Sequence, residues 1–271
     1  MASEVSAFEL VDIGLNLAHD SFDADRDDVI ERAAEAGVTR MVLTGSSPDS
    51  NRDALALANA HPARFWSTAG MHPHHASDYD NAVHDGIASL LPENKVVAVG
   101  ECGLDYFRNF SPPEAQRGAF ERQLDLAESS GLPVFLHQRD AHEDFLEILE
   151  PRLGRLSRAV AHCFTGSEEE LRRYVELGLY VGITGWICDE RRGTHLKDIV
   201  SLIPDDRLML ETDAPYLLPR SLRPKPKTRR NEPAWLTEVL KVVAEARGQT
   251  EAHVAEVTTR TAETFFGLPG N

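Results

Sequence analysis

Cysteine is scarce in this sequence, and its arrangement argues against two kinds of fold. The three cysteines, Cys102, Cys163 and Cys188, are odd in number and form no C-x-x-C pair. Neither a disulfide scaffold nor a thiolate zinc site is therefore expected. Each cysteine lies in or beside an apolar run, which predicts buried, reduced thiols and a cytoplasmic location.

Long hydrophobic runs are also absent. None approaches the length of about 20 residues that a membrane-spanning helix needs. The N-terminal residues MASEVSAFEL lack the basic and then apolar segments of a secretory signal. We therefore expect a protein without a membrane partner.

Basic residues are outnumbered, because 28 Lys and Arg face 44 Asp and Glu and the formal net charge is -16. Such a surface repels phosphate and anionic lipid at long range, which argues against a general nucleic-acid coat protein or a membrane-surface protein. A polyanionic partner would have to be bound locally, by a metal ion or a basic patch.

Linkers are missing as well. No Pro-, Gly- or Ser-rich tract divides the 271 residues, of which 42% are hydrophobic. A chain of this length can form one barrel domain with a large core. We therefore predict a single domain over residues 1–271, and a monomer.

The sequence does contain a rhythm of eight short apolar runs that alternate with helical patterns. Strand followed by helix, repeated in this way, predicts an α/β fold and specifically a (β/α)8 TIM barrel. The eight expected strands lie at residues 8–14, 38–45, 64–72, 95–101, 132–137, 158–164, 179–185 and 207–213.

Helix signals fill most of the intervals. In two of them a serine is followed three residues later by glutamate, which predicts a capping box: Ser111 with Glu114, and Ser167 with Glu170. Gly131 is expected to end the first of these helices. The expected helices span residues 23–37, 50–60, 78–91, 111–131, 141–153, 167–178 and 232–247.

Polar residues follow several of the expected strands. In a (β/α)8 barrel the active site lies at the C-terminal ends of the strands, where these side chains would meet. Carboxylates and neutral imidazoles are ligands that suit magnesium, manganese or zinc. Any one of them alone is more simply a hydrogen-bonded structural residue, but their shared position favours a metal site. The residues are His72, His74, Glu101, Asp105, His137, Arg139, His162, Glu211 and Asp213.

The segment PRSLRPKPKTRRNEP, after the eighth strand, reverses the local charge, with six basic residues against Glu232. Arg191 and Arg192 add to it after the seventh strand. A solvated loop is the plainer interpretation, but loops at this position in barrels often bind phosphate. Aromatic residues in loops of the same rim are candidates for stacking on unpaired bases, and most of them would simply pack: Tyr106, Phe107, Phe110, Trp186 and Tyr216.

Long motifs resemble the TatD family of metal-dependent deoxyribonucleases from about residue 12 to residue 266. They include AGMHPH, GECGLDYFRNFSPPEAQ, PVFLHQRDAH, AHCFTG, GITGWICDERRG and ETDAPYLLPR. The resemblance implies an amidohydrolase-like barrel and a magnesium-dependent 3'-5' exonuclease acting on single-stranded DNA and RNA, in DNA repair or nucleic-acid turnover. Manganese or zinc are alternatives to magnesium.

The resemblance also implies roles for individual residues. Glu101, His137 and His162 match the metal ligands, and Asp213 matches a catalytic aspartate that also faces the metal. Glu101 is thus both a ligand and part of the catalytic set. His72 and His74 match histidines that line the site. Apart from the resemblance, we also expect substrate contacts from Asn16, Arg139 and Arg191.

The segment DIGLNL departs from two-metal relatives, which have His-x-His after the first strand. Here those positions are Gly14 and Asn16. Glycine offers no ligand atom and an amide is a weak one, so we expect one firmly held metal. A second would arrive only with substrate.

Two rival functions stay open at this point. The same ligands can activate water against carbon, as in an amidohydrolase-type deacylase or deaminase. The altered first strand also allows a nucleic-acid-binding pseudoenzyme without catalysis. Sensitivity of a nuclease activity to chelators separates these alternatives.

Overall fold

The computed structural model describes residues 8–270. Most of the N-terminal segment MASEVSAFEL, on which the expectation of no secretory signal depends, therefore lies outside the described residues. Within the described part of the chain, no helix combines the length and the apolar character needed to cross a bilayer.

The strands confirm the predicted fold class. Within residues 8–270 all eight expected strands are present, and they form one sheet in chain order, as a (β/α)8 barrel requires. The strands are β1 (Leu10–Leu15), β2 (Val38–Leu43), β3 (Phe65–Ala69), β4 (Val96–Asp105), β5 (Val134–Arg139), β6 (Ala159–Ala161), β7 (Tyr180–Ile183) and β8 (Leu208–Leu210).

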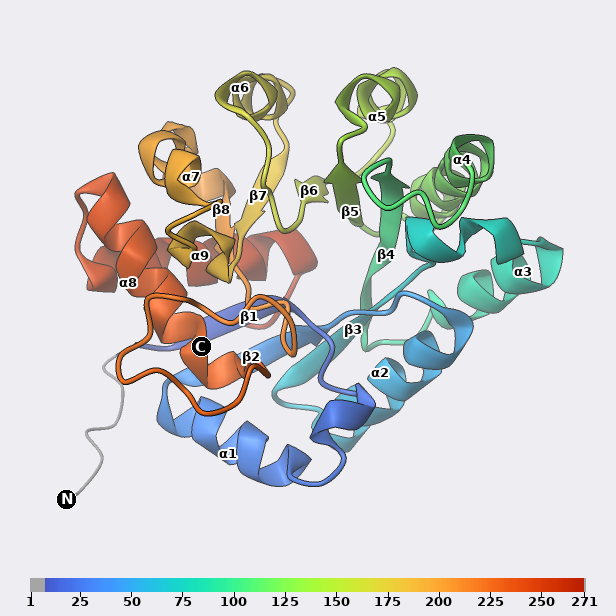
Figure 1. Cartoon of the computed structure of the whole chain (residues 1–271). Helices are drawn as coiled ribbons and strands as arrows, with labels where there is room; N and C mark the ends of the chain where they lie inside the picture. The colour runs from blue at the N-terminus through green and yellow to red at the C-terminus, as the bar shows by residue number, and fades with distance from the viewer. Residues whose placement is uncertain (1–7, 271) are drawn as a thin grey trace. The chain divides into compact units, whose positions relative to one another are not determined.

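The helices alternate with these strands, and all seven expected segments are helical (Figure 1). Two further helices, α7 and α9, were not predicted. The helices are α1 (Arg26–Glu35), α2 (Pro48–Ala60), α3 (Asn81–Leu90), α4 (Pro113–Ser130), α5 (His142–Leu149), α6 (Glu168–Glu176), α7 (Thr194–Ile199), α8 (Leu236–Arg247) and α9 (Glu251–Phe266).

One of the two predicted capping boxes is wrong. At α6, Glu170 N–H donates to Ser167 Oγ at 3.3 Å and Ser167 N–H donates to the Glu170 carboxylate at 2.6 Å, as expected. Helix α4 instead begins one residue later than predicted, and Pro112 is its N-cap. The Ser111 hydroxyl is buried and donates to the carbonyl oxygen of His74 at 2.9 Å. A loop contact thus takes the hydroxyl from the helix.

Internal packing divides the chain into two compact units. The central unit comprises Leu43–His162 and Glu176–Tyr180, and the described residues of the terminal unit are 8–42, Cys163–Val175 and 181–270.

In the central unit, α4 packs on β4 and α2 packs on β3 (Figure 1). Val99 of β4, Phe120 and Leu124 of α4 and Phe135 of β5 are fully buried. This apolar core fixes β4 and β5 side by side, and these two strands carry most of the polar residues at the candidate site.

In the terminal unit, α9 packs against both β1 and β8. The chain beyond these two strands is joined by main-chain hydrogen bonds, from Asp213 N–H to Gly14 O at 2.9 Å and from Asn16 N–H to Ala214 O at 2.7 Å. The first and last strands of the barrel therefore meet at their C-terminal ends.

Candidate metal centre

Strand β4 places Glu101 at an irregularity. The register of β4 against β5 shifts between Gly100 and Cys102, so Glu101 lies at a bulge, which turns its side chain away from the regular alternation. A Cβ atom at Gly103, where φ is +140°, would collide with the carbonyl oxygen of His137. Glycine at this position thus lets β4 approach β5 closely and brings Glu101 beside His137.

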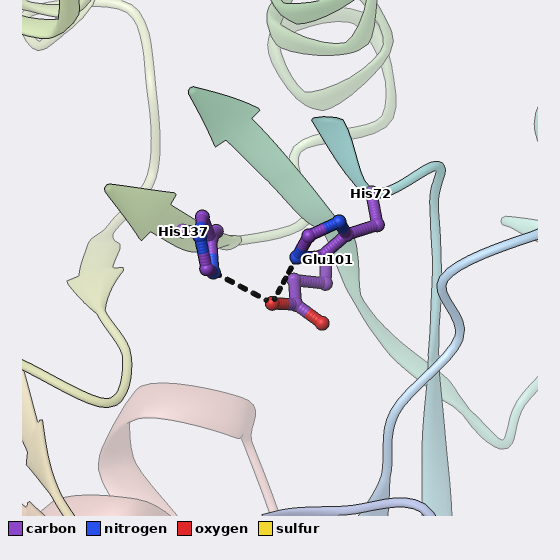
Figure 2. A group of neighbouring side chains, drawn as sticks. All are labelled: His72, Glu101 and His137. Atoms are coloured by element: carbon purple, nitrogen blue, oxygen red, sulfur yellow. Dashed lines mark hydrogen bonds and ion pairs between the residues drawn. The ribbon is translucent and has the colours of Figure 1, made fainter. Parts of the chain in front are cut away.

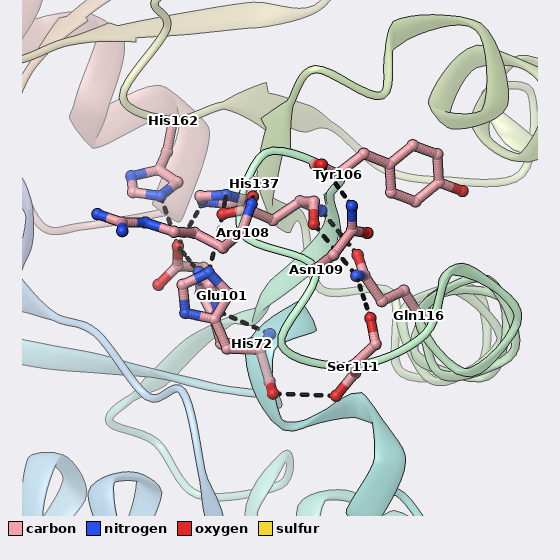
Figure 3. Close-up of polar contacts among 11 residues, drawn as sticks. His72, Glu101, Tyr106, Arg108, Asn109, Ser111, Gln116, His137 and His162 are labelled. Atoms are coloured by element: carbon pink, nitrogen blue, oxygen red, sulfur yellow. Dashed lines mark hydrogen bonds and ion pairs between the residues drawn. The ribbon is translucent and has the colours of Figure 1, made fainter.

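Three imidazole rings converge on the Glu101 carboxylate. Figure 2 shows those of His72 and His137, and Figure 3 adds that of His162. Glu101 Oε1 lies 2.8 Å from His162 Nε2, 3.0 Å from His137 Nδ1 and 3.3 Å from His72 Nε2. Ligand atoms of His72, Glu101 and His137 all lie within 4.8 Å of one another. The central unit therefore contains a group of side chains that can hold a metal ion.

The electrostatics of this group favour an ionised carboxylate. Burial alone would raise the pKa of Glu101, but the facing His72, His162 and His137 outweigh it and hold the pKa well below its usual value. Burial lowers the pKa of His72 to about 4, so this ring is neutral at physiological pH. Burial also opposes protonation of His137, but the hydrogen bonds that this ring donates to Asp105 and Glu101 raise its pKa.

Asp105 bridges two of the histidines. Its Oδ2 lies 2.8 Å from His74 Nε2 and 3.2 Å from His137 Nε2. Because a carboxylate accepts and does not donate, the Nε2 atom of His137 keeps its proton. Nδ1 faces the Glu101 carboxylate, so without a metal ion it also carries a proton. A metal ion beside Glu101 would displace that proton and bind the Nδ1 lone pair, with Asp105 behind Nε2, as in metal-binding histidines backed by a carboxylate.

His72 has the opposite arrangement. Its Nδ1 accepts the main-chain N–H of His74 at 3.0 Å, so the lone pair of the neutral ring is used there. Its Nε2 carries the proton and donates toward Glu101. Distance alone would admit His72 as a ligand, but its hydrogen bonds make it a donor to oxygen. The role of His72 in contacting substrate stays a prediction.

Two glutamines of α4 were missed in the sequence, and they hold the site's main chain (Figure 3 shows Gln116). Gln116 accepts from Asp105 N–H at 2.8 Å and donates to Asp105 O at 3.1 Å. Gln123 makes the same pair with Met71, next to His72, at 2.7 and 3.1 Å. Both lie on the buried stripe of α4. A polar residue on such a stripe requires hydrogen-bond partners, and this was the signal available.

The terminal unit contains the remaining predicted acidic residues. Asp213 has a positive φ of 55°, and its Oδ1 lies 3.4 Å from the Asn16 amide nitrogen. Asp12 is fully buried and accepts from Thr212 N–H at 3.0 Å and from Gly14 N–H at 3.3 Å. Glu211 is also buried and accepts the Cys163 N–H. DIGLNL therefore supports the turn that carries Asp213.

The predicted arginines are both engaged. The guanidinium of Arg139 lies 3.9 Å from the ring centre of Phe107. Arg191 pairs with Asp189, a buried carboxylate that Arg192 and Arg220 also approach. In the basic segment, Arg220 pairs with Glu190 and Arg230 with Asp25, whereas Lys225, Lys227 and Arg229 are exposed. Ion pairs thus anchor both ends of this segment.

The donor atoms fit a divalent cation. Glu101 supplies carboxylate oxygen, and His137 and His162 supply imidazole nitrogen, without thiolate. Oxygen and nitrogen donors of this kind suit magnesium, manganese or zinc. The carboxylate is buried and ionised, so a cation beside it would compensate its charge.

Comparisons with known proteins identify the family. The family described as TatD related DNase matches residues 11–267. A protein of Erwinia tasmaniensis named 3'-5' ssDNA/RNA exonuclease TatD is 51% identical over 259 residues, which cover 96% of this chain and 100% of that protein. A Salmonella typhimurium protein of the same name is 50% identical over 257 residues, covering 95% and 98%. The crystal structure of a TatD homologue from Escherichia coli K12 matches with a TM-score of 0.87 at 29% identity, covering 96% and 98%. The chain belongs to the family of TatD-related DNases.

Proposed function

We propose that this protein is a metal-dependent 3'-5' exonuclease that hydrolyses phosphodiester bonds of single-stranded DNA and RNA. The observation that carries the proposal is the convergence of His137 and His162 on the buried Glu101 carboxylate. Relatives that are about half identical over nearly the whole chain bear the name of this activity.

We assign Mg²⁺ as the metal and Glu101, His137 and His162 as its ligands. Asp213 is assigned to the metal as well, because it matches the aspartate of the family motif. When bound, Mg²⁺ would neutralise charge on a phosphate oxygen and make a water molecule easier to deprotonate. Magnesium acidifies water less than zinc does, so a protein base is needed. Asp213 is the proposed base, since the Asn16 amide holds its carboxylate in place.

The remaining residues act on the substrate. His72 is neutral and its Nε2–H can donate to a phosphate oxygen as negative charge develops there. His74, Arg139, Arg191 and Asn16 are proposed to position the strand. In the hydrolysis, the water oxygen bonds to phosphorus and one of its protons passes to Asp213. The bond to the sugar oxygen breaks, and that oxygen leaves with the electron pair and takes up a proton from solvent.

An amidohydrolase acting on carbon centres remains the rival enzyme. The exposed cations at Lys225, Lys227 and Arg229 favour the nuclease, because an otherwise acidic protein needs local positive charge to receive a polyanion. We further place the protein in the cytoplasm as a monomer, serving DNA repair or nucleic-acid turnover. Its three cysteines form no disulfide, which suits a reducing compartment; Cys102 and Cys188 are buried as expected, whereas Cys163 is half-buried.

The test is digestion of single-stranded DNA and RNA carrying a label at either end. With Mg²⁺ we expect 3'-labelled strands to release the label first, and 5'-labelled strands to shorten through a ladder. EDTA should abolish both. Removal of a ligand should cost more than the roughly 100-fold loss seen for residues that only support ligands, so Glu101→Ala should be inactive.

The matched control is Glu128→Ala, because Glu128 is a carboxylate of the central unit that pairs with Arg152 and Arg155 away from the centre. Its activity should equal that of the wild type. Nuclease activity that survives EDTA, or that Glu101→Ala retains, would refute the proposal. Metal binding without any nuclease activity would favour the amidohydrolase.

A further inference from the structure

Few large apolar side chains are exposed in the described part of the chain. They are Phe107, Phe110 and Tyr216, at 52%, 67% and 51% exposure. Two of them lie in the six-residue loop Tyr106–Ser111 that follows β4, which we call the β4 loop. Aromatic rings left in water next to a candidate active site mark a surface that binds something apolar and flat.

The β4 loop is held in one conformation by hydrogen bonds (Figure 3). Asp105 Oδ1 accepts the Arg108 N–H at 2.8 Å, and Asp105 O accepts the Asn109 N–H at 3.3 Å. At the other end, Gln116 donates to Ser111 O at 2.8 Å. The rings of Phe107 and Phe110 are therefore presented by a fixed scaffold.

The loop also adjoins the candidate metal centre. The Phe110 ring packs edge-on to His74 with 4.8 Å between ring centres, and His74 packs on His72 at 4.1 Å. His72 in turn faces the Glu101 carboxylate at 3.3 Å. A chain of ring contacts thus connects the exposed Phe110 to the residues proposed to bind metal and phosphate.

Phe107 is paired with positive charge. The Arg139 guanidinium lies 3.9 Å from its ring centre and that of Arg108 lies 5.5 Å away. Such a pair can bind a nucleotide, because the apolar ring can stack on the flat base and the guanidinium can contact the phosphate. Tyr106 does not take part in this way, because its hydroxyl donates to Asp144 at 2.7 Å.

We propose that the β4 loop is a base-binding subsite, at which unpaired nucleobases beside the cleaved phosphate stack on Phe107 and Phe110. This inference rests on the proposed nuclease function and names the residues that select the substrate. A phenyl ring has no hydrogen-bonding group, so it reads neither the edge of a base nor the 2'-hydroxyl. The subsite therefore accepts any base in DNA or RNA.

The same subsite selects against duplexes. A base within a duplex already stacks on both of its neighbours, and it reaches a protein ring only after unstacking and unpairing. An unpaired 3' end stacks without that cost. Phe107 and Phe110 are accordingly the determinants of single-strand preference, whereas Glu101, His137 and His162 act on any phosphodiester.

The experiment compares wild type with the double variant Phe107→Ala/Phe110→Ala. One substrate is a single-stranded DNA 12-mer, and the other is the same strand with tetrahydrofuran abasic residues at its last two 3' positions. On the normal strand, the double variant should raise KM roughly 10- to 100-fold with kcat nearly unchanged, since each stacked base contributes to binding. On the abasic strand, wild type and variant should have equal KM values.

Matched substitutions separate stacking from packing. Phe110→Leu retains an apolar side chain but no aromatic face, so it should behave like Phe110→Ala, and Phe110→Trp should retain wild-type KM. Both rings are exposed, so the melting temperature and the Mg²⁺ affinity measured by calorimetry should stay unchanged in all of these variants.

Two results would overturn the inference. One is an unchanged KM of the double variant on the normal strand. The other is an equal loss on normal and abasic strands, which would mean that the rings support the active site and do not bind bases. If the wild type degrades DNA and Glu101→Ala does not, either result refutes the subsite alone. If the wild type has no nuclease activity, the proposed function fails with it.

Discussion

The central and terminal units both gather buried carboxylates at strand ends, but they satisfy them differently. In the central unit, Glu101 faces imidazole nitrogens of His137 and His162 at 3.0 and 2.8 Å. In the terminal unit, Asp12 faces main-chain N–H groups of Thr212 and Gly14. An imidazole can exchange a proton for a metal ion, whereas a main-chain amide cannot. The first cluster therefore suits a cation, and the second holds the chain together.

The pKa values of Glu101 and Asp12 are shifted in opposite directions. Burial opposes ionisation of both, yet the histidines hold the pKa of Glu101 well below its usual value. Burial raises the pKa of Asp12 to about 7 despite hydrogen bonds from Thr212 and Gly14. Only the central cluster thus keeps its negative charge over the whole physiological pH range, and a cation is attracted to a permanent charge.

Among the substitutions that test this comparison, Asp105→Asn is expected to have the largest effect, on Mg²⁺ affinity. Asp105 keeps a proton on His137 Nε2 so that Nδ1 faces the metal side. An amide can turn its NH2 group toward Nε2 and favour the wrong tautomer. We expect Mg²⁺ affinity to fall roughly 10- to 100-fold, as for other carboxylates that support metal-binding histidines. Isothermal titration calorimetry measures this without relying on activity.

Asp144→Asn is the matched control for that prediction. Asp144 is a carboxylate of the same unit, and it accepts from the Tyr106 hydroxyl. Its replacement should leave Mg²⁺ affinity unchanged. If Asp105→Asn also binds Mg²⁺ like the wild type, then Asp105 has no part in orienting His137, and the contrast between the two clusters is weaker than proposed.

The candidate site was largely predictable because the barrel topology does most of the placement. Once strand and helix alternate eight times, residues at the ends of β4, β5 and β6 must meet, so Glu101, His137 and His162 were expected together. Asp105 was noted only as a polar residue at the strand end. Its contacts depend on β4 continuing past the bulge at Glu101, which periodicity does not reveal.

Contacts of single polar groups were the least predictable part. Gln116 and Gln123 were passed over because their role depends on how α4 lies on β4 and on the chain after β3. Ser111 was predicted as a helix cap, but a nearby carbonyl of His74 accepts its hydroxyl instead. Helix α9 was missed although Thr250 caps it, since α8 already supplies the helix that follows the last strand.

A smaller effect, on stability and not on metal binding, is expected for Asp12→Asn. The folded pKa of Asp12 is raised, so the native state holds a proton that the unfolded chain has already lost between about pH 4 and pH 7. The stability contributed by this group therefore falls as pH rises through that window. The variant lacks this titration. At pH 5 it should lose about 1–3 kcal/mol, because its NH2 group faces N–H donors.

Urea unfolding at several pH values measures the difference between wild type and variant. The advantage of the wild type should shrink from pH 4 to pH 7, while the Mg²⁺ affinity of the two proteins stays within about twofold of each other, since Asp12 touches no proposed ligand. Parallel stability curves would contradict the raised pKa. A large loss of Mg²⁺ affinity would place Asp12 in the metal site and break the comparison.

The smallest effect is expected for Asp25→Asn, which tests a third way of satisfying a carboxylate. Asp25 pairs with Arg230 at 2.7 Å and with Arg32 at 3.4 Å. The hydrogen bond from Arg230 is the main reason that the pKa of Asp25 is lowered, so its stabilising contribution is present above about pH 4 and is lost as pH falls below that value. Because the pair is partly exposed, the loss at pH 7 should be under about 1 kcal/mol and should shrink in 0.5 M salt. Urea unfolding at pH 7 and pH 3 measures this loss of stability, with Asp78→Asn, at an exposed aspartate, as control.

The arginine partners of Asp25 differ from the histidines around Glu101 in one respect. A guanidinium keeps its proton at any accessible pH, so a metal ion cannot replace that proton as it can on an imidazole. An equal loss of stability at both pH values would show that the Asp25 side chain stabilises the fold without its charge. Among the carboxylates compared here, only Glu101 would then have its charge compensated by its neighbours, the histidines.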